Sequence, residues 1–226
     1  MTKYSSDNLQ CLAGASSCAM TTQVITLQQE VSRLTELVHT DTLTGLYNYR
    51  HLTQALDSEM ERTRRCGRPT GLIALDLDHF KQVNDTWGHE AGNQVLVHTA
   101  RLLEQHVRKL DIPCRYGGEE IFIILPSSDL TETLRVAERV RQAIAQSPVT
   151  TDTGNITVTA SLGVAIYDGA RMQSATDFMK QADSYLYEAK QAGRNCCCHP
   201  PQPESHAVSI DEKAALFGMF GTAEEL

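Results

Sequence analysis

Short apolar runs alternate with helix-forming segments along most of this chain, and that order restricts the fold more than any other feature. The run at 72–75 is entirely apolar and leads into Asp76, which is typical of a buried strand. Residues 114–116 and the apolar run 121–125 flank Gly117-Gly118-Glu119-Glu120, as in a β-hairpin whose glycines supply positive φ at the turn. Helical periodicity covers 49–65, 92–109, 130–146 and 178–191, and a β-rich run covers 156–166. We therefore expect an α/β fold, with a mixed sheet that includes antiparallel pairing and is surrounded by helices.

An additional helical segment precedes this region. Its apolar residues recur at alternating spacings of three and four and so share one stripe of a helix: Val24, Leu27, Val31, Leu34 and Val38. The stripe covers about two heptads, so both a short dimerising coiled-coil stalk and a lone helix packed on its own domain remain open. We divide the chain into an N-terminal tail and helix over 1–40, a main domain over 41–199 and a C-terminal tail over 200–226.

Composition excludes several classes of protein. Of the 226 residues, 41% are hydrophobic and 21% are charged, as expected for a globular protein. The chain lacks both an apolar stretch of the roughly 18 residues that a membrane span needs and a signal peptide, so we expect cytoplasmic residence. A net charge of −8 argues against a nucleic-acid surface but allows a small anionic substrate. The seven cysteines follow no disulfide framework, and the run Cys196–Cys198 lacks zinc-knuckle spacing, so it reads as an ordinary strand and tail.

Two acidic pairs stand where strands are expected to end. Asp76 and Asp78 close the first strand, and Glu119 with Glu120 occupies the hairpin turn. Carboxylate and carbonyl oxygens are the ligands that Mg²⁺ prefers. Solvated turns use the same residue types, so spacing alone leaves a metal site and a plain turn equally open.

The segment from Asp76 to His89, read together with Arg115-Tyr-Gly-Gly-Glu-Glu-Ile121, resembles the GGDEF family of diguanylate cyclases. The likeness begins at Asp41-x-Leu-Thr-Gly-Leu and ends at Lys190-x-x-x-Arg194-Asn195. It implies a fold similar to the palm of nucleotidyl cyclases and the condensation of two GTP molecules into cyclic di-GMP and pyrophosphate. It also implies a Mg²⁺ cofactor, for which Mn²⁺ can substitute, and a homodimer during catalysis. Ile121 replaces the family's Phe and keeps that position apolar.

The resemblance also implies roles for individual residues. Asp76, Glu119 and the backbone carbonyl of Leu77 match the family's metal ligands. Glu120 matches a carboxylate that binds a second metal or helps to deprotonate the attacking 3′-hydroxyl, and these roles remain open. The positions that match substrate contacts are the backbone of His79, Phe80 and Lys81 and the side chains of Lys81, Lys190 and Arg194 for the phosphates, with Asn84, Asn93 and Leu96 for the base.

Two features bear on specificity and regulation. Asn93 stands where the family usually has Asp, which weakens guanine recognition and makes partial ATP acceptance conceivable. Arg108 and Asp111 match an Arg-x-x-Asp inhibitory site for the product, with Arg139 as a secondary contact. The alternatives to a product-inhibited diguanylate cyclase are a weakly catalytic module that senses GTP or cyclic di-GMP, and a cyclase that makes cyclic AMP or a mixed dinucleotide. No sensor domain is expected within residues 1–40, so the input signal is unknown.

Overall fold

The computed structural model describes residues 22–30, 39–151 and 154–201. A five-stranded sheet has the strand order β2-β3-β1-β6-β7, and β4 pairs with β5 in a separate hairpin. The helices are α2 (Tyr49–Cys66), α3 (Phe80–Trp87), α4 (His89–His106), α5 (Leu130–Gln146) and α6 (Ala175–Gln191). The strands are β1 (Thr70–Leu77), β2 (Ile112–Gly117), β3 (Glu120–Leu125), β4 (Val149–Thr151), β5 (Gly154–Ile156), β6 (Ala160–Tyr167) and β7 (Cys197–Cys198). The expected α/β fold with a mixed sheet is confirmed.

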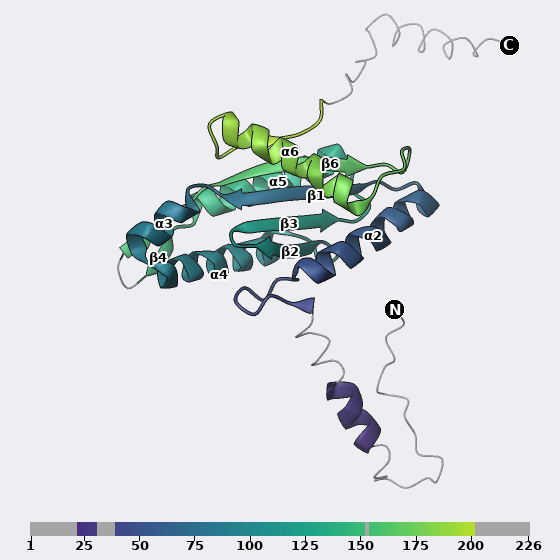
Figure 1. Ribbon diagram of the computed structural model, residues 1–226, viewed down its shortest axis with the longest axis horizontal. Helices are drawn as coiled ribbons and strands as arrows, with labels where there is room; N and C mark the ends of the chain where they lie inside the picture. The colour runs from purple at the N-terminus through teal and green to yellow at the C-terminus, as the bar shows by residue number, and fades with distance from the viewer. Residues whose placement is uncertain (1–21, 31–38, 152–153, 202–226) are drawn as a thin grey trace, which may run out of the picture.

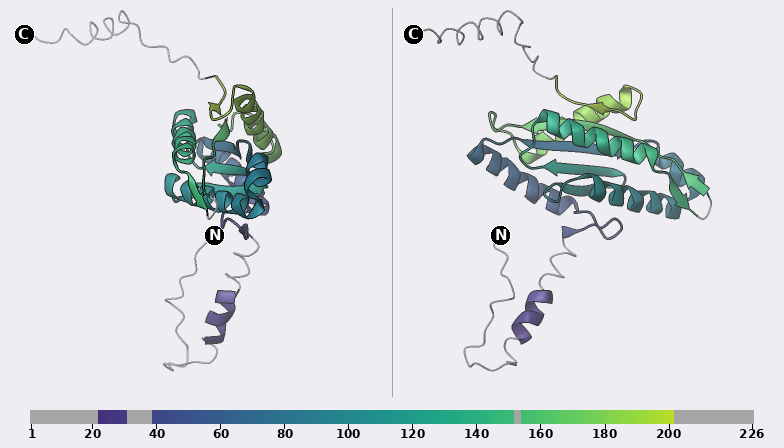
Figure 2. Two further views of the ribbon diagram at one scale, coloured as in Figure 1. Left: turned by 90° about the vertical axis from the view of Figure 1, so that its left-hand side faces the viewer. Right: turned by 180° about the vertical axis from the view of Figure 1, so that it is seen from behind.

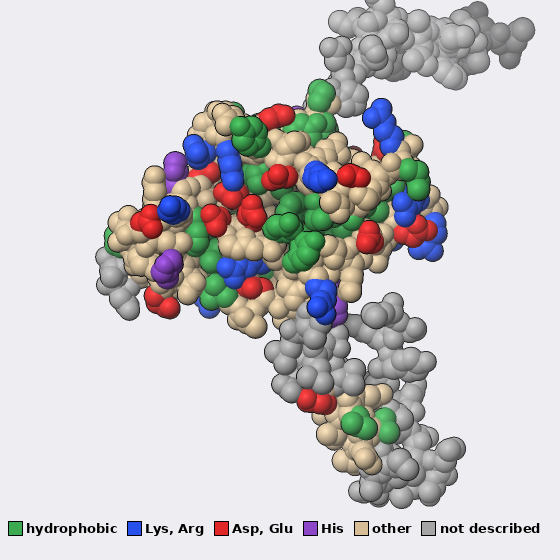
Figure 3. Space-filling view, viewed as in Figure 1, with side chains coloured by type: hydrophobic (Ala, Val, Ile, Leu, Met, Phe, Trp, Pro, Cys, Tyr) green, Lys and Arg blue, Asp and Glu red, His purple; other side chains and the backbone are tan. Residues whose placement is uncertain are grey.

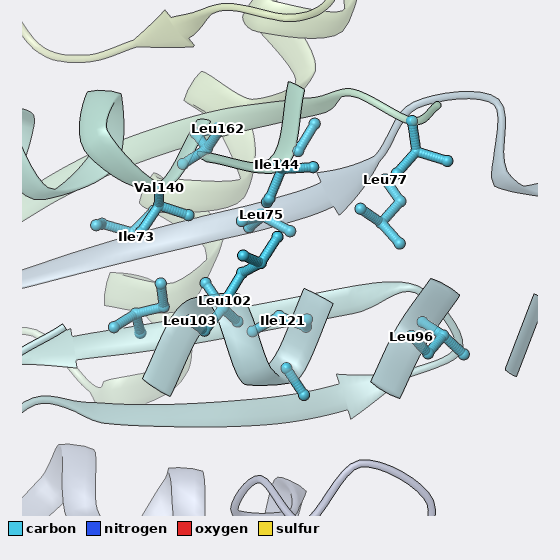
Figure 4. Packing of buried hydrophobic residues seen from close by; sticks show 14 of the residues in the cluster. Ile73, Leu75, Leu77, Leu96, Leu102, Leu103, Ile121, Val140, Ile144 and Leu162 are labelled. Atoms are coloured by element: carbon cyan, nitrogen blue, oxygen red, sulfur yellow. The ribbon is translucent and has the colours of Figure 1, made fainter. Parts of the chain in front are cut away.

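Helices cover both faces of the sheet. Figure 1 shows α2 and α6 on the face of the sheet toward the viewer, and the view from behind in Figure 2 shows α4 and α5 on the opposite face. Because side chains alternate along a strand, β1 contributes Ile73, Leu75 and Leu77 to the core beneath α4 and α5. Figure 4 shows this core, where Leu103 of α4 and Ile144 of α5 pack against the sheet. Fully burying each such side chain contributes about 1.5–3 kcal/mol.

The opposite face of β1 points toward α2 and α6. Leu72 and Ala74 lie there in a second core with Leu52 of α2 and Phe178 of α6. The next residue on this face is Asp76, at the end of the strand. The alternation therefore brings an acidic side chain to the face that α6 covers.

β1 is antiparallel to both of its neighbours. Asp76 is opposite Glu120 on β3 and Ser161 on β6. Residues opposite one another point to the same face of a sheet. Only β7 runs parallel to its neighbour, β6, among the pairs of the described sheet. The expected strand at Cys196–Cys198 is present as β7, and the cysteines at 66, 114 and 196–198 are free thiols.

Two expected element boundaries and one expected turn conformation were wrong. The β-rich run at 156–166 is divided between β5 and β6, because Thr159 turns to pair with Asp78 instead of continuing a strand. Helix α4 ends at His106 instead of continuing to residue 109, because the Asp111 carboxylate accepts the backbone N–H of Arg108 in a new turn. Of the two hairpin glycines, only Gly118 has positive φ, at 54°.

The N-terminal region is described in part. Residues 22–30 are helical, as expected, and Leu27 is 58% exposed. Val31, Leu34 and Val38 lie outside the described residues, so the coiled-coil and packed-helix readings remain predictions. Further along, Tyr47 pairs with Cys114 at the outer edge of β2. No helix in the described segments is long and apolar enough to cross a membrane.

Candidate active site

Acidic and basic side chains meet where β1 ends beside α3. The Lys190 ammonium nitrogen on α6 lies 2.9 Å from Oδ2 of Asp76. Glu120 shares this face, directly opposite Asp76 on β3. Helix α6 comes this close because Gly163 of β6 lacks a side chain, and a Cβ there would overlap the backbone of Leu186. The close contact between α6 and the sheet thus brings Lys190 to Asp76 and Glu120, and all three are expected site residues.

Burial and crowding of negative charge raise two pKa values in this group. The pKa of Asp76 lies above its ordinary value because burial disfavours the carboxylate, although Lys190 acts in the opposite direction. The negative charges of Glu119 and Asp78 add to the increase. The pKa of Glu120 is raised by burial first and then by Asp76. An additional cation would relieve this repulsion.

The ligand set suits a hard divalent ion. All of its atoms are oxygens, which Mg²⁺ prefers, and nearby carboxylates add to the effect of burial in raising the pKa values of Asp76 and Glu120. No group of three or more His, Cys, Asp or Glu side chains in the described segments is arranged to hold a metal. The set implied by the family resemblance needs only two carboxylates, Asp76 and Glu119, together with the Leu77 carbonyl. A site with two ligating side chains is not excluded by the absence of a larger group in the described segments.

Asp78 lies outside the metal set that the resemblance implies, and its carboxylate is used in hydrogen bonds within the chain. Its carboxylate is buried and accepts hydrogen bonds at both oxygens. Ser161 Oγ donates to Oδ1 at 2.6 Å, and Thr159 Oγ1 donates to Oδ2 at 2.7 Å. The backbone N–H of Asn195 also donates to Oδ2, at 3.0 Å. Asp78 therefore connects the end of β1 to β6 and to the turn that follows α6.

The start of α3 supplies backbone donors beside the acidic group. His79 is the N-cap residue, with a left-handed φ of 57°, and its side chain makes no capping bond. The first N–H groups of a helix have no partner within it and attract anions. Phe80 is buried and fixes this turn, while Lys81 is exposed. Arg194, also exposed, follows α6 with a φ of 65°.

The residues expected to contact a base occupy two separate positions. A Cβ at Gly92 would overlap the side-chain oxygen of Asn84, so α3 and α4 meet at this glycine. Asn93 lines a neighbouring cavity of about 470 Å³, and Asn84 is not among the residues that line it. Leu43 and His98 lie in the same wall as Asn93. Leu96 is 3% exposed and belongs to the core.

Sequence analysis missed a connection between the β2–β3 hairpin and the segment before α2. The Arg115 guanidinium donates from Nη1 to Asp41 at 2.9 Å and from Nε to the carbonyl of Gly118 at 2.9 Å. Asp41 also closes a turn by accepting from the N–H and hydroxyl of Thr44. Both residues lie in recognisable motifs, but nothing in their spacing indicates that they touch.

The three expected inhibitory residues gather at the other end of β2 from the hairpin turn. Asp111 is buried and accepts the backbone N–H of Arg108 at 2.7 Å. Burial raises the pKa of Asp111, although the charges of Arg108 and Arg139 oppose the increase. Arg139 of α5 donates from Nε and Nη2 to the carbonyl of His106, at 2.9 and 2.6 Å. Two guanidinium groups and a carboxylate therefore surround the end of α4.

Residues 38–196 match the family described as diguanylate cyclase, GGDEF domain. This chain belongs to the GGDEF domain family. The match includes the site from Asp41 to Asn195. The response regulator PleD of Caulobacter vibrioides is 42% identical over 171 residues, and diguanylate cyclase DosC of Escherichia coli is 36% identical over 178. These alignments cover 75% and 76% of this chain but only 37% and 38% of those proteins.

Solved structures support the same GGDEF fold. The coiled coil and GGDEF domain of DgcB from Caulobacter crescentus, in complex with cyclic di-GMP, has a TM-score of 0.74 and 28% identity. That comparison covers 80% of this chain and 95% of the other. Diguanylate cyclase SiaD of Pseudomonas aeruginosa, in complex with its activator SiaC, has a TM-score of 0.71 and 38% identity, covering 80% of this chain and 69% of SiaD. The fold therefore places the acidic group within a GGDEF architecture.

Proposed function

We propose that this GGDEF domain is a diguanylate cyclase that joins two GTP molecules into cyclic di-GMP and releases pyrophosphate. The observation that carries the proposal is the meeting of Asp76, Glu120 and Lys190 on one face of the sheet, next to the start of α3. Phosphoryl transfer needs little covalent chemistry from a protein and much positioned charge. The site offers carboxylates for a cation and basic groups for phosphates side by side.

Each residue has a place in this reaction. Asp76, Glu119 and the Leu77 carbonyl would hold Mg²⁺, or Mn²⁺ in its place, and the ion would neutralise charge on the α-phosphate and on departing pyrophosphate. Lys190, which pairs with Asp76, would supply positive charge to the phosphates. The phosphates are also contacted by the amides of His79, Phe80 and Lys81 and by the side chains of Lys81 and Arg194. Guanine is contacted by Asn84, Asn93 and Leu96.

Two chains take part in each cycle. One GTP is held by each chain, and each 3′-hydroxyl attacks the α-phosphate of the other nucleotide as pyrophosphate leaves. Glu120 lies opposite Asp76 and either accepts the hydroxyl proton or binds a second ion, and its raised pKa suits a base. The apolar stripe that begins at Val24 favours the dimer, and the coiled coil of DgcB supports this arrangement. We place the protein in the cytoplasm because GTP is found there.

The proposal includes inhibition by product. Cyclic di-GMP binds at Arg108, Asp111 and Arg139, because guanidinium forks bind both phosphate and guanine edges. These side chains lie together at the end of α4, away from the hairpin turn. The complex of DgcB with cyclic di-GMP supports the assignment of this ligand class to the fold.

Two alternatives follow from particular residues. A binding module without turnover would use the inhibitory site alone, but the acidic group and Lys190 argue against it. A mixed-dinucleotide activity rests on Asn93, whose amide offers one acceptor where guanine presents two donors. Adenine presents an acceptor next to a donor, which an amide can satisfy in its flipped orientation.

Mass spectrometry of the products tests the proposal. The protein is incubated with Mg²⁺ and GTP, ATP or both, with Asp76→Asn as the inactive control. We expect cyclic di-GMP from GTP and, with both nucleotides, a mixed product in the minority that decreases further in Asn93→Asp. Tight GTP binding without any cyclic product would contradict the cyclase assignment and support a sensor.

A further inference from the structure

Two residues after α6 have a left-handed backbone conformation, which is disfavoured for residues other than glycine. Arg194 has a φ of 65° and Asn195 a φ of 45°. Residues with a Cβ are strained in this region and persist there only where their surroundings hold them. Arg194 is also a residue whose guanidinium we direct at the phosphates. The question is which groups keep this turn in place.

The first group is the buried carboxylate of Asp78. Asp78 is 6% exposed, and its backbone N–H donates to the Thr159 carbonyl at 2.8 Å. Its Oδ2 accepts both the hydroxyl of Thr159 and the backbone N–H of Asn195, and its Oδ1 accepts the hydroxyl of Ser161. A buried carboxylate with three donors is well satisfied as an anion. It anchors the turn from the side of the sheet.

The second group is the guanidinium of Arg141 on α5. Its Nη1 donates to the Asn195 carbonyl at 3.1 Å and to the Asn195 side-chain oxygen at 2.6 Å. The same guanidinium is held by Glu138, one turn earlier, at 2.7 Å. Asn195 therefore donates a hydrogen bond from its N–H to Asp78 and accepts hydrogen bonds from Arg141 at its carbonyl and its side-chain oxygen. The backbone N–H of Arg194 also donates to the Ala189 carbonyl, at 3.1 Å.

We propose that Asp78 is a positioning residue for substrate binding, and not a metal ligand. By fixing Asn195 it holds the left-handed turn that carries Arg194, directly after the helix that carries Lys190. The inference rests on the proposed function because it assigns Arg194 to the triphosphate of GTP. Arg141 supports the same turn from the opposite side. Breaking these hydrogen bonds should therefore weaken binding of the β- and γ-phosphates of GTP.

The comparison of Asp78→Asn with Asp78→Ala tests the assignment. An amide placed with its oxygen at the Oδ2 position still accepts from Thr159 and Asn195, while its nitrogen donates to the Ser161 hydroxyl, which can also accept. We expect Asp78→Asn to keep the KM for GTP within about threefold and Asp78→Ala to raise it about tenfold or more, with a smaller change in kcat. A metal ligand would behave differently, because an amide lacks the charge that holds Mg²⁺. Equal loss of activity in both variants would overturn the proposal.

A second pair of variants avoids the buried carboxylate, whose removal can impair folding. Arg141→Ala removes both contacts to Asn195, and we expect the KM for GTP to rise several-fold with little change in Tm. Glu138→Gln is the matched control, because it weakens the ion pair of Arg141 but leaves the bonds to Asn195 in place. An unchanged KM in Arg141→Ala would overturn the proposal.

Binding measurements separate this inference from the proposed function. The Kd of a non-hydrolysable GTP analogue with Mg²⁺ is compared with the Kd of GMP, which lacks the β- and γ-phosphates. In Asp78→Ala and Arg141→Ala we expect weaker binding of the analogue and an unchanged Kd for GMP. A wild-type protein that binds the analogue but makes no cyclic di-GMP would reject the cyclase assignment, and the two Kd values would still decide the role of Asp78. Equal losses for both ligands would show that the turn does not act on the terminal phosphates.

Discussion

Lys190 forms an ion pair with Asp76, at 2.9 Å, across the contact between α6 and β1. The carboxylate that we assign to a divalent cation is therefore already paired with a protein cation. Both groups are partly shielded from water, since the side chain of Asp76 is 12% exposed and that of Lys190 is 32% exposed. Cation binding and nucleotide binding should consequently be linked through this lysine.

Lys190→Met should strengthen divalent binding in the absence of nucleotide and weaken GTP binding. Removal of the ammonium group leaves more uncompensated negative charge around Asp76, which favours a divalent ion by several-fold. Titration with Mn²⁺, followed by electron paramagnetic resonance, measures the first effect. Lys180→Met is the control, because Lys180 is on the same helix but contacts Asp177. Weaker Mn²⁺ binding in Lys190→Met than in the parent would contradict this linkage.

Glu120→Gln should make the protein more stable near neutral pH when no divalent ion is present. The raised pKa of Glu120 means that the folded protein binds this proton more tightly than the unfolded chain does. The resulting contribution is present at acid pH and is lost as pH rises from the ordinary Glu value of 4.5 through the raised folded value. We expect Tm to decline over that range in the parent and less in Glu120→Gln.

The measurement is thermal unfolding in a chelator at a series of pH values. Glu104→Gln, which changes an exposed residue of α4, is the control. Added Mg²⁺ should raise the Tm of the parent more than that of Glu120→Gln. Parallel Tm curves for the parent and Glu120→Gln would show that the electrostatic strain lies elsewhere.

Arg115→Ala should lower kcat by about tenfold or more while changing the Kd of the GTP analogue less. The guanidinium connects the Asp41 turn to the Gly118 carbonyl, so its removal releases the hairpin that carries Glu119 and Glu120. Asp41→Asn should have a milder effect, because an amide oxygen can still accept from Thr44 and Arg115. Steady-state kinetics and analogue binding measure the two effects. An Asp41→Asn defect larger than that of Arg115→Ala would show that the charge of Asp41, not the tie to Gly118, is what matters.

Local signals predicted the elements well, whereas distant contacts were beyond them. Helix α5 matches its expected range of 130–146, and Asp129 with Glu132 forms a capping box at its start. By contrast, Asp78 meets partners 81, 83 and 117 positions away, so its structural role has no local signature. The pair Asp41–Arg115 is separated by 74 positions. The motifs indicated which residues belong to the candidate site. Only the folded chain shows which of them fix the positions of others through hydrogen bonds.

Gly92→Ala should raise the KM for GTP several-fold, because the added Cβ overlaps the side-chain oxygen of Asn84 and displaces it. Helix propensity favours alanine over glycine, so a loss of Tm is not the expected cause. A double-variant cycle with Asn84→Ala gives the test. If the two changes act through one contact, the double variant is no worse than Asn84→Ala alone. Additive increases in KM would mean that Gly92 acts independently of Asn84.

Arg108→Ala should relieve inhibition by cyclic di-GMP without lowering the initial rate. Arg108 lies at the end of α4, at the opposite end of β2 from the catalytic hairpin, so the two functions are spatially separate. The inhibition constant of added cyclic di-GMP is measured for the parent, Arg108→Ala and the exposed neighbour Lys109→Ala. The lysine variant should retain inhibition. Unaltered inhibition in Arg108→Ala would place the regulatory site elsewhere.

The two outer strands of the five-stranded sheet leave little opportunity for edge-to-edge polymerisation. The outer side of β2 is already occupied at Tyr47, which exchanges backbone hydrogen bonds with Pro113 and Arg115. The opposite side ends in β7, which has only two residues. Short or covered margins of this kind protect natural sheets from adding strands of another molecule. In the proposed dimer, two copies would then dock through side-chain surfaces, where contact can be made and released more readily than a shared sheet.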